Sequence, residues 1–446
     1  MRRYIFKSTL VLILLPFAMR AQEAKLLSLK DAMDYAVKNN ATAKNARLDI
    51  LIQKAKNAEI TGIALPQVSA KGEFNDYIDP IKSFVPAEFI GGPAGTFVAV
   101  PFTPKYSSTA SATASQILFD GSVMVALQAR NALIKLAEQG AQMSEEEIRY
   151  NVQKAYYGFV IAKRQFNILK SSLAYARNMA NDLNVTYQNG LIEKIEVDRT
   201  MVQVNNLATD SIKTASMILI SEQLLKFQMG MDINQPVELT DTALNITINS
   251  VSDILSDAPT NYTNRTDFNL LQSQLKLNQY DLKRHRYSGL PTLAAFGSAA
   301  YTYSSNTFND VLNKPYIFYS LVGLQLKVPI FDGFQRHKRV TQAQLNVEKV
   351  QNNIENLKLG IDFLTAQSRT TLKNALLASE TQRKNMDLAT TVLDLANKKY
   401  KAGVGSNTEV SLAQTELLKA QANYFSSMLE VINAKSDLQK ALGQFK

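Results

Sequence analysis

Two hydrophobic periods alternate along this chain and predict long helices joined to pairs of strands. From Ile148 to Tyr187 the apolar positions step by alternating three and four residues, the spacing of a coiled-coil seam. The stretches after residues 347 and 410 repeat this spacing and include many small Ala and Ser residues, which let helices approach closely. No Pro interrupts residues 121–187, and at 1.5 Å per residue such a helix runs about 100 Å.

A period of two marks the strands. Apolar and polar or small residues alternate over 110–115 and again over 322–330, which indicates strands with two different faces. We expect their partners at 67–77 and 292–306. Each copy of the pattern would then hold one antiparallel pair, with strands near the ~10 residues that cross a bilayer when tilted.

The chain repeats itself once. Phe119-Asp120-Gly121 recurs as Phe331-Asp332-Gly333, and the order of the other motifs is the same in both halves. Downstream, Tyr187, Gly190, Glu196, Val197 and Gly230 recur at Tyr400, Gly403, Glu409, Val410 and Gly443. Such self-similarity predicts two structural repeats.

The predicted organisation follows from this duplication. A signal peptide covers 1–21, the first repeat 22–230, a linker or equatorial segment 231–267, and the second repeat 268–446. The first repeat has a helix, strands at about 67–77 and 106–119, a long helix at 122–188 and a return helix at 192–230. The second has a helix, strands at about 292–306 and 317–331, a long helix at 334–402 and a return helix at 406–444. Loops 78–105 and 304–315, which join the strands, are expected outside the cell.

The N-terminus has the composition of an export signal. Residues 1–21 combine a basic start, an apolar stretch and a final Ala21, and the apolar stretch is too short to cross a bilayer. Four of the cations lie in this leader, so the net charge of +10 falls to 45 − 39 = +6 in the mature chain. That weak, interspersed charge does not indicate nucleic acid. Zero Cys excludes disulfides and thiolate chemistry.

Four strands per chain predict an oligomer. An open strand edge in hydrocarbon leaves backbone groups without hydrogen bonds, and closing a barrel takes about eight strands or more. Two copies would give a small filled barrel, and three copies would give twelve strands with room for a lumen. Either oligomer would gather the helices into a cylinder. The fold class expected from the pattern is mainly α, a tandem-repeat helical coiled-coil barrel with four β-strands per protomer in a membrane β-barrel shared between protomers.

These motifs resemble the TolC family, the trimeric outer membrane factors of efflux pumps and type I secretion systems. The resemblance rests on Leu65-Pro66-Gln67-Val68, on the two Phe-Asp-Gly motifs at the barrel–helix junctions, and on Tyr187 with Gly190 and Tyr400 with Gly403 at the tip turns. It implies a homotrimer with a twelve-stranded β-barrel in the outer membrane of a Gram-negative bacterium, with a long periplasmic extension. It also implies docking to a periplasmic adaptor protein and an inner membrane pump.

The resemblance places a gate at the periplasmic entrance. The family's acidic and tyrosine positions read Glu196 and Tyr400, whereas the arginine position reads Gly405, with Lys401 nearby as a substitute. Of two acidic rings at the constriction, Glu409 matches one and Leu412 occupies the other. Three converging carboxylates would attract cations. Considered alone, Glu196 or Glu409 also fits a solvated acid in the first turn of a helix.

Two basic clusters are candidates for binding phosphates of outer membrane lipids, although ordinary exposed helix ends explain them equally well. Their cations are Lys283, Arg284, Arg286, Arg336, Lys338 and Arg339. The only two His, His285 and His337, lie in these clusters without readable acidic ligands, so no metal is expected. The sequence shows no phosphate-binding Gly loop, nucleophile motif or acid–base pair, and neither a cofactor nor enzymatic activity is predicted.

The sequence therefore predicts a passive exit duct for efflux or type I secretion. The alternative from another class is an exported structural coiled-coil protein without a pore, whose strands form a soluble sheet.

Overall fold

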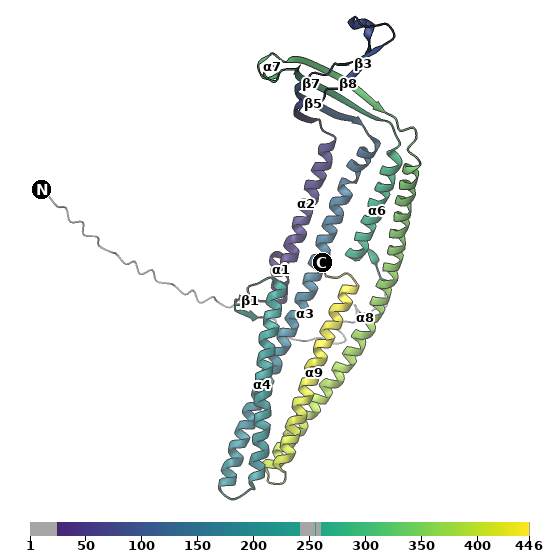
Figure 1. Cartoon of the computed structure of the whole chain (residues 1–446). Helices are drawn as coiled ribbons and strands as arrows, with labels where there is room; N and C mark the ends of the chain where they lie inside the picture. Colours follow the sequence, from purple (N-terminus) through teal and green to yellow (C-terminus); the bar gives the residue numbers. More distant parts are fainter. Residues whose placement is uncertain (1–24, 241–254, 256–259, 446) are drawn as a thin grey trace, which may run out of the picture.

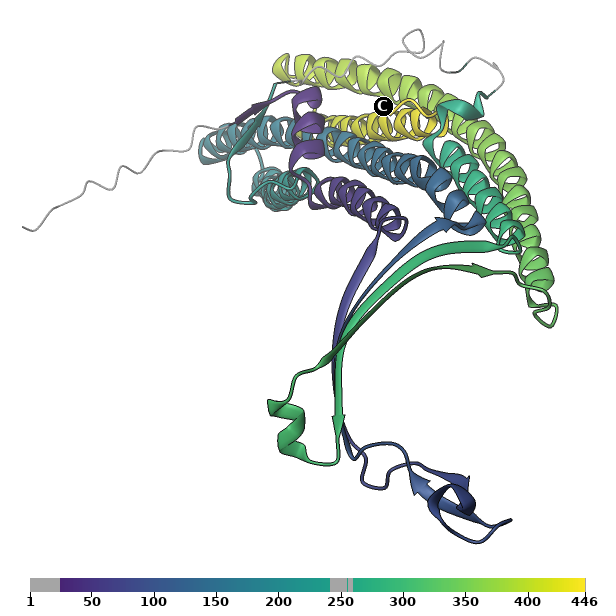
Figure 2. The same ribbon diagram turned by 90° about the horizontal axis from the view of Figure 1, so that it is seen from above.

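The computed structural model describes residues 25–240, 255 and 260–445. The predicted export signal at 1–21 and most of the segment 241–259 lie outside the described residues. A curved sheet occupies one end of the molecule, and long helices run from it to two turns at the opposite end (Figure 1). Seen from above, the helices and the strands both follow an open arc rather than a closed ring (Figure 2).

Each copy contributes a short helix that leads to the sheet, a long helix that leaves it and a return helix. The elements of the first copy are α1 Leu29–Asn39, α2 Ala41–Ile63, α3 Gly121–Gln188 and α4 Lys194–Met229. Those of the second copy are α6 Thr266–Tyr287, α8 Gln335–Lys401 and α9 Asn407–Ala441. The return helices begin two and one residues later than expected and end at Met229 and Ala441. Within the described part of the chain, no helix combines the length and apolarity needed to span a membrane.

The main sheet has four antiparallel strands in the order β2–β5–β7–β8. Their bounds are Gln67–Asp76, Tyr106–Phe119, Thr292–Ser305 and Ile317–Lys327. The two hairpins, β2–β5 and β7–β8, come from the two copies and meet through β5 and β7. The edge strands β2 and β8 are exposed along almost their whole length.

The last strand is shorter than predicted, because β8 ends at Lys327 instead of residue 331. In the first copy the corresponding residues, 116–119, pair with β7. Residues 328–331 have no strand beside them in the single chain as described, and Pro329 has no amide hydrogen to donate to a ladder. The sequence pattern of a strand thus extends beyond the strand that one chain can form.

The connecting segments hold structure that the sequence did not predict. The loop 78–105 contains a hairpin of β3 (Lys82–Pro86) and β4 (Phe97–Pro101) with a short helical turn between them. The loop 304–315 contains the short helix α7, Phe308–Asn313. Near the middle of the molecule, β1 (Lys25–Leu27) and β6 (Val237–Leu239) form a parallel pair.

The core lies along the predicted coiled-coil seams. Val152, Phe159, Leu173 and Leu183 are buried on α3, and Val410, Leu417, Val431 and Leu438 are buried on α9. The largest cluster surrounds the middle of α3, where α1, α4 and α9 converge. There the hydroxyl of the buried Tyr156 donates to the carbonyl of Leu27 at 3.1 Å, which ties the N-terminal strand to the long helix.

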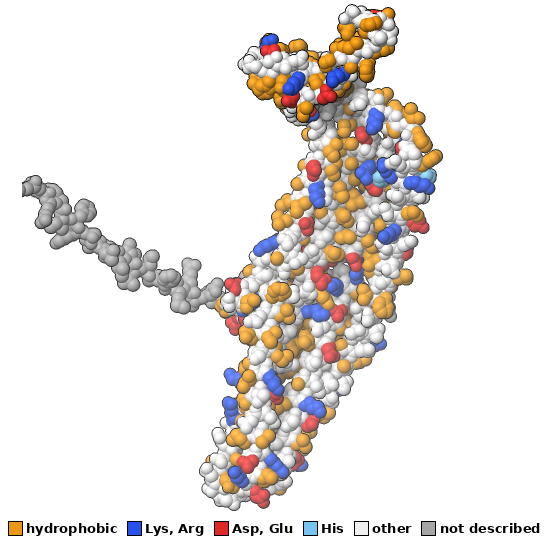
Figure 3. All heavy atoms as spheres, viewed as in Figure 1, with side chains coloured by type: hydrophobic (Ala, Val, Ile, Leu, Met, Phe, Trp, Pro, Cys, Tyr) orange, Lys and Arg blue, Asp and Glu red, His pale blue; other side chains and the backbone are white. Residues whose placement is uncertain are grey.

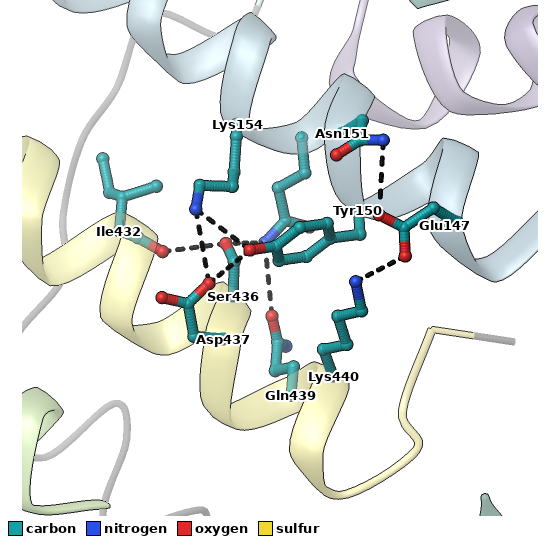
Figure 4. A network of polar contacts seen from close by, with 10 residues as sticks. Glu147, Tyr150, Asn151, Lys154, Ile432, Ser436, Asp437, Gln439 and Lys440 are labelled. Carbon is teal, nitrogen blue, oxygen red and sulfur yellow. Dashed lines mark hydrogen bonds and ion pairs between the residues drawn. The ribbon is translucent and has the colours of Figure 1, made fainter. Parts of the chain in front are cut away.

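A polar network joins the two copies beside this core (Figure 4). The Tyr150 hydroxyl on α3 donates to Asp437 Oδ1 on α9 at 2.6 Å. Lys154 Nζ lies 3.0 Å from the Tyr150 hydroxyl and 3.3 Å from Asp437 Oδ1, and Lys440 forms an ion pair with Glu147. These bonds hold α9 against α3 above the two turns.

Candidate functional site

The candidate site lies at the two turns farthest from the sheet (Figure 1). In the first, the amide of Gly190 donates to the carbonyl of Tyr187 at 2.8 Å, and in the second Gly403 donates to Tyr400 at 3.0 Å. Both glycines have positive φ, +75° and +77°, a conformation that Gly adopts at little steric cost. The predicted tip residues therefore build the same turn twice.

Asn407 joins the two turns. Its side-chain amide donates to Glu196 Oε2 and to Thr200 Oγ1, each at 3.1 Å. Asn407 is 6% exposed and Thr200 2% exposed, so these bonds between α9 and α4 are protected from water. The other amide atom, Asn407 Oδ1, is buried without a hydrogen-bond partner, which costs stability and offsets part of what the two bonds contribute.

Arg199 is a cation beside Glu196 that the sequence analysis did not name. Its guanidinium lies 3.3 Å from Glu196 Oε1 and 3.4 Å from Thr408 Oγ1. The sequence suggested Lys401 as the substitute for the missing arginine, but Lys401 is exposed and Arg199 is the cation beside Glu196. The relevant signal was local, because Arg199 follows Glu196 by three residues and shares its helix face.

Asn407 could also have been found from the pattern. The seam of α9 includes Val410, Gln414 and Leu417, all buried. One further step of three residues toward the N-terminus reaches Asn407. A polar residue at a seam position is a candidate for a specific contact with the facing helix.

Tyr400 packs at the edge of this site, against the small cluster of Ala396, Val410 and Ala413. Burial raises the pKa of its phenol above the ordinary value, and the negative charges of Asp182 and Glu196 add to that effect. The Tyr400 phenol therefore stays neutral close to two acidic residues of the first copy.

Glu409 has a different environment from Glu196. Its backbone amide donates to the capping Ser406 hydroxyl at 3.2 Å, and its carboxylate pairs with Lys399 at 3.0 Å. Both side chains of this ion pair are 46% exposed. At Gly405, an added Cβ would lie 3.0 Å from Lys399 Cβ and from the Tyr400 amide nitrogen. The turn is thus built around the missing side chain at 405.

The two Phe-Asp-Gly motifs serve different local structures. Asp120 accepts hydrogen bonds from the amides of Ser122 and Val123, at 2.8 and 3.2 Å, and caps α3. Gly121 is buried against the backbone of Tyr287. In the second motif, Gly333 and Phe334 both have positive φ and Phe331 is exposed, although Asp332 still accepts from the Arg336 amide at 2.8 Å.

The basic residues gather where α6 ends and α8 begins, below the sheet (Figure 3). Lys283 donates to Gln128 at 3.1 Å and Arg284 pairs with Asp281 at 2.8 Å. Arg336 lies over Gly289, and Arg339 donates to Gln335 at 3.1 Å. Two neighbouring aromatic rings, Phe331 and Phe334, are exposed beside them.

Comparison with known proteins agrees with this fold. The model of the family described as outer membrane efflux protein matches residues 263–444. The alkaline protease secretion protein AprF of Pseudomonas aeruginosa is 21% identical over 352 residues, which cover 77% of this chain and 69% of AprF.

Two solved structures have the same fold. The outer membrane protein VceC of Vibrio cholerae matches with a TM-score of 0.70 and 13% identity, over 93% of this chain and 96% of VceC. The outer membrane channel CmeC of Campylobacter jejuni matches with a TM-score of 0.69 and 16% identity, over 93% of this chain and 85% of CmeC.

Fold and sequence together define a class of outer membrane channel built from a strand wall and long helices. The predicted resemblance to the TolC family is confirmed by the family model over the second repeat, by the similarity to AprF and by the shared fold of VceC and CmeC. The family model and these relatives describe transport proteins rather than enzymes.

Proposed function

We propose that three copies of this chain form an exit duct across the outer membrane of a Gram-negative bacterium. The observation that carries this proposal is the open sheet, whose edge strands β2 and β8 have no partner beyond the sheet within the described chain. Unpaired strand edges are costly in hydrocarbon, and head-to-tail pairing of the two different edges, β8 of one chain with β2 of the next, can close a ring. Three copies give twelve strands, enough for a barrel with a lumen.

The helices support the same stoichiometry. Beside the sheet, each protomer presents α2, α3, α6 and α8, and toward the turns it presents α3, α4, α8 and α9 (Figure 1). Four helices at every level become twelve in a trimer. This helical cylinder would extend into the periplasm, where it would dock to an adaptor protein and receive cargo from an inner membrane pump.

The contact of Asn407 with Glu196 and Thr200 acts in this proposal as a latch between the two copies of the repeat. It is supported by the burial of all the bonded atoms of Asn407 and Thr200 and by the Arg199–Thr408 bond beside it. Glu196, Tyr400, Gly405 and Glu409 would then line or support the entrance. Freeing α9 from α4 would allow the second turn to move outward.

Conductance measurements test the duct and the latch together. Purified trimer in planar bilayers is expected to conduct ions, and Asn407→Ala is expected to increase the conductance because two inter-repeat bonds are lost. Asn205→Ala on the exposed side of α4 is the matched control and should leave conductance unchanged. A monomeric protein that never conducts would overturn the duct, and unchanged conductance in Asn407→Ala would overturn the latch alone. The comparisons give no support to a structural coiled-coil protein without a pore.

The basic residues at the ends of α6 and α8 are proposed to bind phosphates of the periplasmic leaflet. Lys and Arg near a membrane surface attract anionic lipids by about 1 kcal/mol each. The exposed Ile330 and Phe331 lie next to them and would enter the apolar layer. Replacing the six cations by Gln should reduce the anionic lipid retained by the purified protein in native mass spectrometry, and unchanged retention would dismiss this role.

A further inference from the structure

The two strand hairpins are related by the duplication residue for residue. Phe119 recurs as Phe331, 331 − 119 = 212 positions later, and Gln67 follows the same Leu-Pro pair as Thr292, 292 − 67 = 225 positions later. With these shifts, β5 corresponds to β8 and β2 corresponds to β7. The internal repeat can therefore be checked against the observed pairing of strands.

The pairing of strands within the chain follows these shifts. Ala70 lies opposite Ala112 in the first hairpin. The shifts carry this pair to Ala295 and Leu324, which lie opposite each other in the second hairpin. The end pair Gln67 and Ser115 maps onto Thr292 and Lys327 in the same way. Both hairpins thus have one register.

One pairing of the sheet has no counterpart within the chain. The first copy's β5 pairs with β7 along its free side, with Ala112 opposite Ala299. The corresponding free side of β8 has no neighbour among the described residues, and neither has the free side of β2. Adding 212 to Ala112 gives Leu324, and subtracting 225 from Ala299 gives Phe74. These two residues lie on the two open edges.

We propose that β8 of one protomer pairs with β2 of the neighbouring protomer in an antiparallel register that sets Leu324 opposite Phe74. This inference rests on the trimeric duct proposed above and specifies how its wall closes. The pair Lys327 and Lys71 then ends a ladder of six residue pairs that begins at Val322 and Asp76. The β5–β7 contact between the two repeats of one chain serves as the template for the contact between protomers.

The side chains fit this register except at its end, where Lys327 lies directly opposite Lys71 and the two ammonium groups repel each other. Leu324 faces Phe74 and Leu326 faces Gly72, on the face that also carries Val68 and Ala70 of β2. Residues directly opposite in a sheet point to the same face, so a slip of one residue would set apolar against polar positions throughout. On the other face Gln325 meets Glu73, which is the residue ion-paired with Lys71 and lies diagonal to Lys327, within reach of its ammonium.

The early end of β8 is explained by the same contact. In the first copy residues 116–117 pair with β7 alone, Gln116 with Ala295 and Ile117 with Ala294. In the proposed register their counterparts, Val328 and Pro329, lie opposite Ala70 and Ser69 of the neighbouring protomer. Val328 is exposed and lies outside β8 in the single chain. Its missing partner is therefore a strand of another protomer.

Engineered cysteines test the register, because the chain contains no Cys. Opposite residues of antiparallel strands have Cα atoms about 4.5–5.5 Å apart, within the range of disulfides. The double variant Leu324→Cys with Phe74→Cys, expressed in full-length protein and oxidised in outer membranes, should give covalent dimers and trimers on non-reducing denaturing gels. Gln325→Cys with Glu73→Cys, the adjacent pair, should do the same.

The matched control is a slipped pair that keeps the same face. Leu324→Cys with Gly72→Cys should give several-fold less cross-copy product, since the two residues are diagonal. Ala112→Cys with Ala299→Cys should cross-link within one chain and verifies oxidation. Stronger cross-linking of the slipped pair than of both register pairs would overturn the register while leaving the trimer intact. If no pair gives a cross-copy product, the internal control forms and the protein is monomeric, the duct itself fails.

Discussion

The long helices α3 and α8 have the same place in the two copies but very different surroundings. Seventeen residues of α3 are buried, against eight of α8. Helix α3 packs against α1, α2, α4, α6 and α9, whereas α8 packs mainly against α6 and α9. Large apolar side chains such as Leu359, Phe363 and Leu388 stay exposed on α8. The comparison teaches that α3 is enclosed by its neighbours within the single chain, whereas α8 leaves much of its apolar surface exposed.

The largest test of this contrast is a pair of Phe substitutions. Phe159 on α3 is 1% exposed and Phe363 on α8 is 65% exposed. Phe159→Ala should lower the free energy of unfolding by about 3–5 kcal/mol, because it opens a cavity in the main core. Phe363→Ala should change the unfolding of a dissociated chain little. Denaturant unfolding in detergent measures both, and equal losses would contradict the contrast.

A smaller loss is expected where the return helices end. Gly230 and Gly443 have positive φ, and an added Cβ would lie 2.8 Å from Asn40 Cα and 2.7 Å from the Asn264 carbonyl oxygen. Gly230→Ala and Gly443→Ala should each cost more than the ~1–2 kcal/mol of a left-handed Ala. Gly190→Ala at the tip has open space and should cost only that. Thermal unfolding of the three variants ranks them, and equal values would show that the close packing yields.

The network between the copies predicts a loss of stability at alkaline pH. Burial and the bond to Asp437 raise the pKa of Tyr150 above its ordinary 10.0. Burial lowers the pKa of Lys154, but its bonds to Tyr150 and Asp437 outweigh this and leave it above 10.5. Folding thus favours both protonated forms. Their contribution is full below about pH 10 and is lost as pH rises through the raised values.

Tyr150→Phe separates this contribution from general alkaline unfolding. The variant should lose about 1 kcal/mol at neutral pH, where a half-buried hydrogen bond to a carboxylate disappears. Its melting temperature should also fall less steeply above pH 10 than that of the unaltered protein. Parallel melting curves over pH 7–11 would show that the network does not titrate as argued.

The smallest effect on stability is expected at the tip of the second copy. The Lys399–Glu409 pair is half exposed, and such pairs contribute about 0–1 kcal/mol. Its effect should appear in ion selectivity instead. Glu409→Ala should reduce cation selectivity in single-channel recordings, whereas Lys399→Ala should increase it by leaving the carboxylate unpaired. If neither changes selectivity, Glu409 does not face the conduction path.

Much of the fold could be predicted from periodicity and repetition alone. The seam from Ile148 to Leu183 sets the direction of α3, and the duplicated Tyr–Gly pairs mark both turns. The alternation at 110–115 and 322–330 identifies strands, but β8 ends before residue 331 because its last residues lack a neighbour. Local pattern predicts what a segment can form, and pairing decides how much of it forms.

The candidate site was less predictable. Glu196 and Tyr400 were named from the sequence, but Arg199, Asn407 and Thr408 were not. The seam marks Asn407 and the helix spacing marks Arg199 as candidates, but their partners on the other helix lie about 210 positions away, as in the bonds of Asn407 with Glu196 and of Arg199 with Thr408. No local pattern encodes those partners. The absence of an arginine at Gly405 was readable, whereas the contact of Arg199 with Thr408 depended on which face of α4 meets α9.

By itself the sequence determined the duplication, the helix and strand periods and the shortage of strands, because these properties depend on residue order and backbone geometry. The tertiary structure decided which long helix is enclosed, which side chains meet at the tip and which strand edges stay open. Those outcomes depend on how two nearly equivalent halves pack against each other, and packing selects one arrangement from contacts that neither half contains alone.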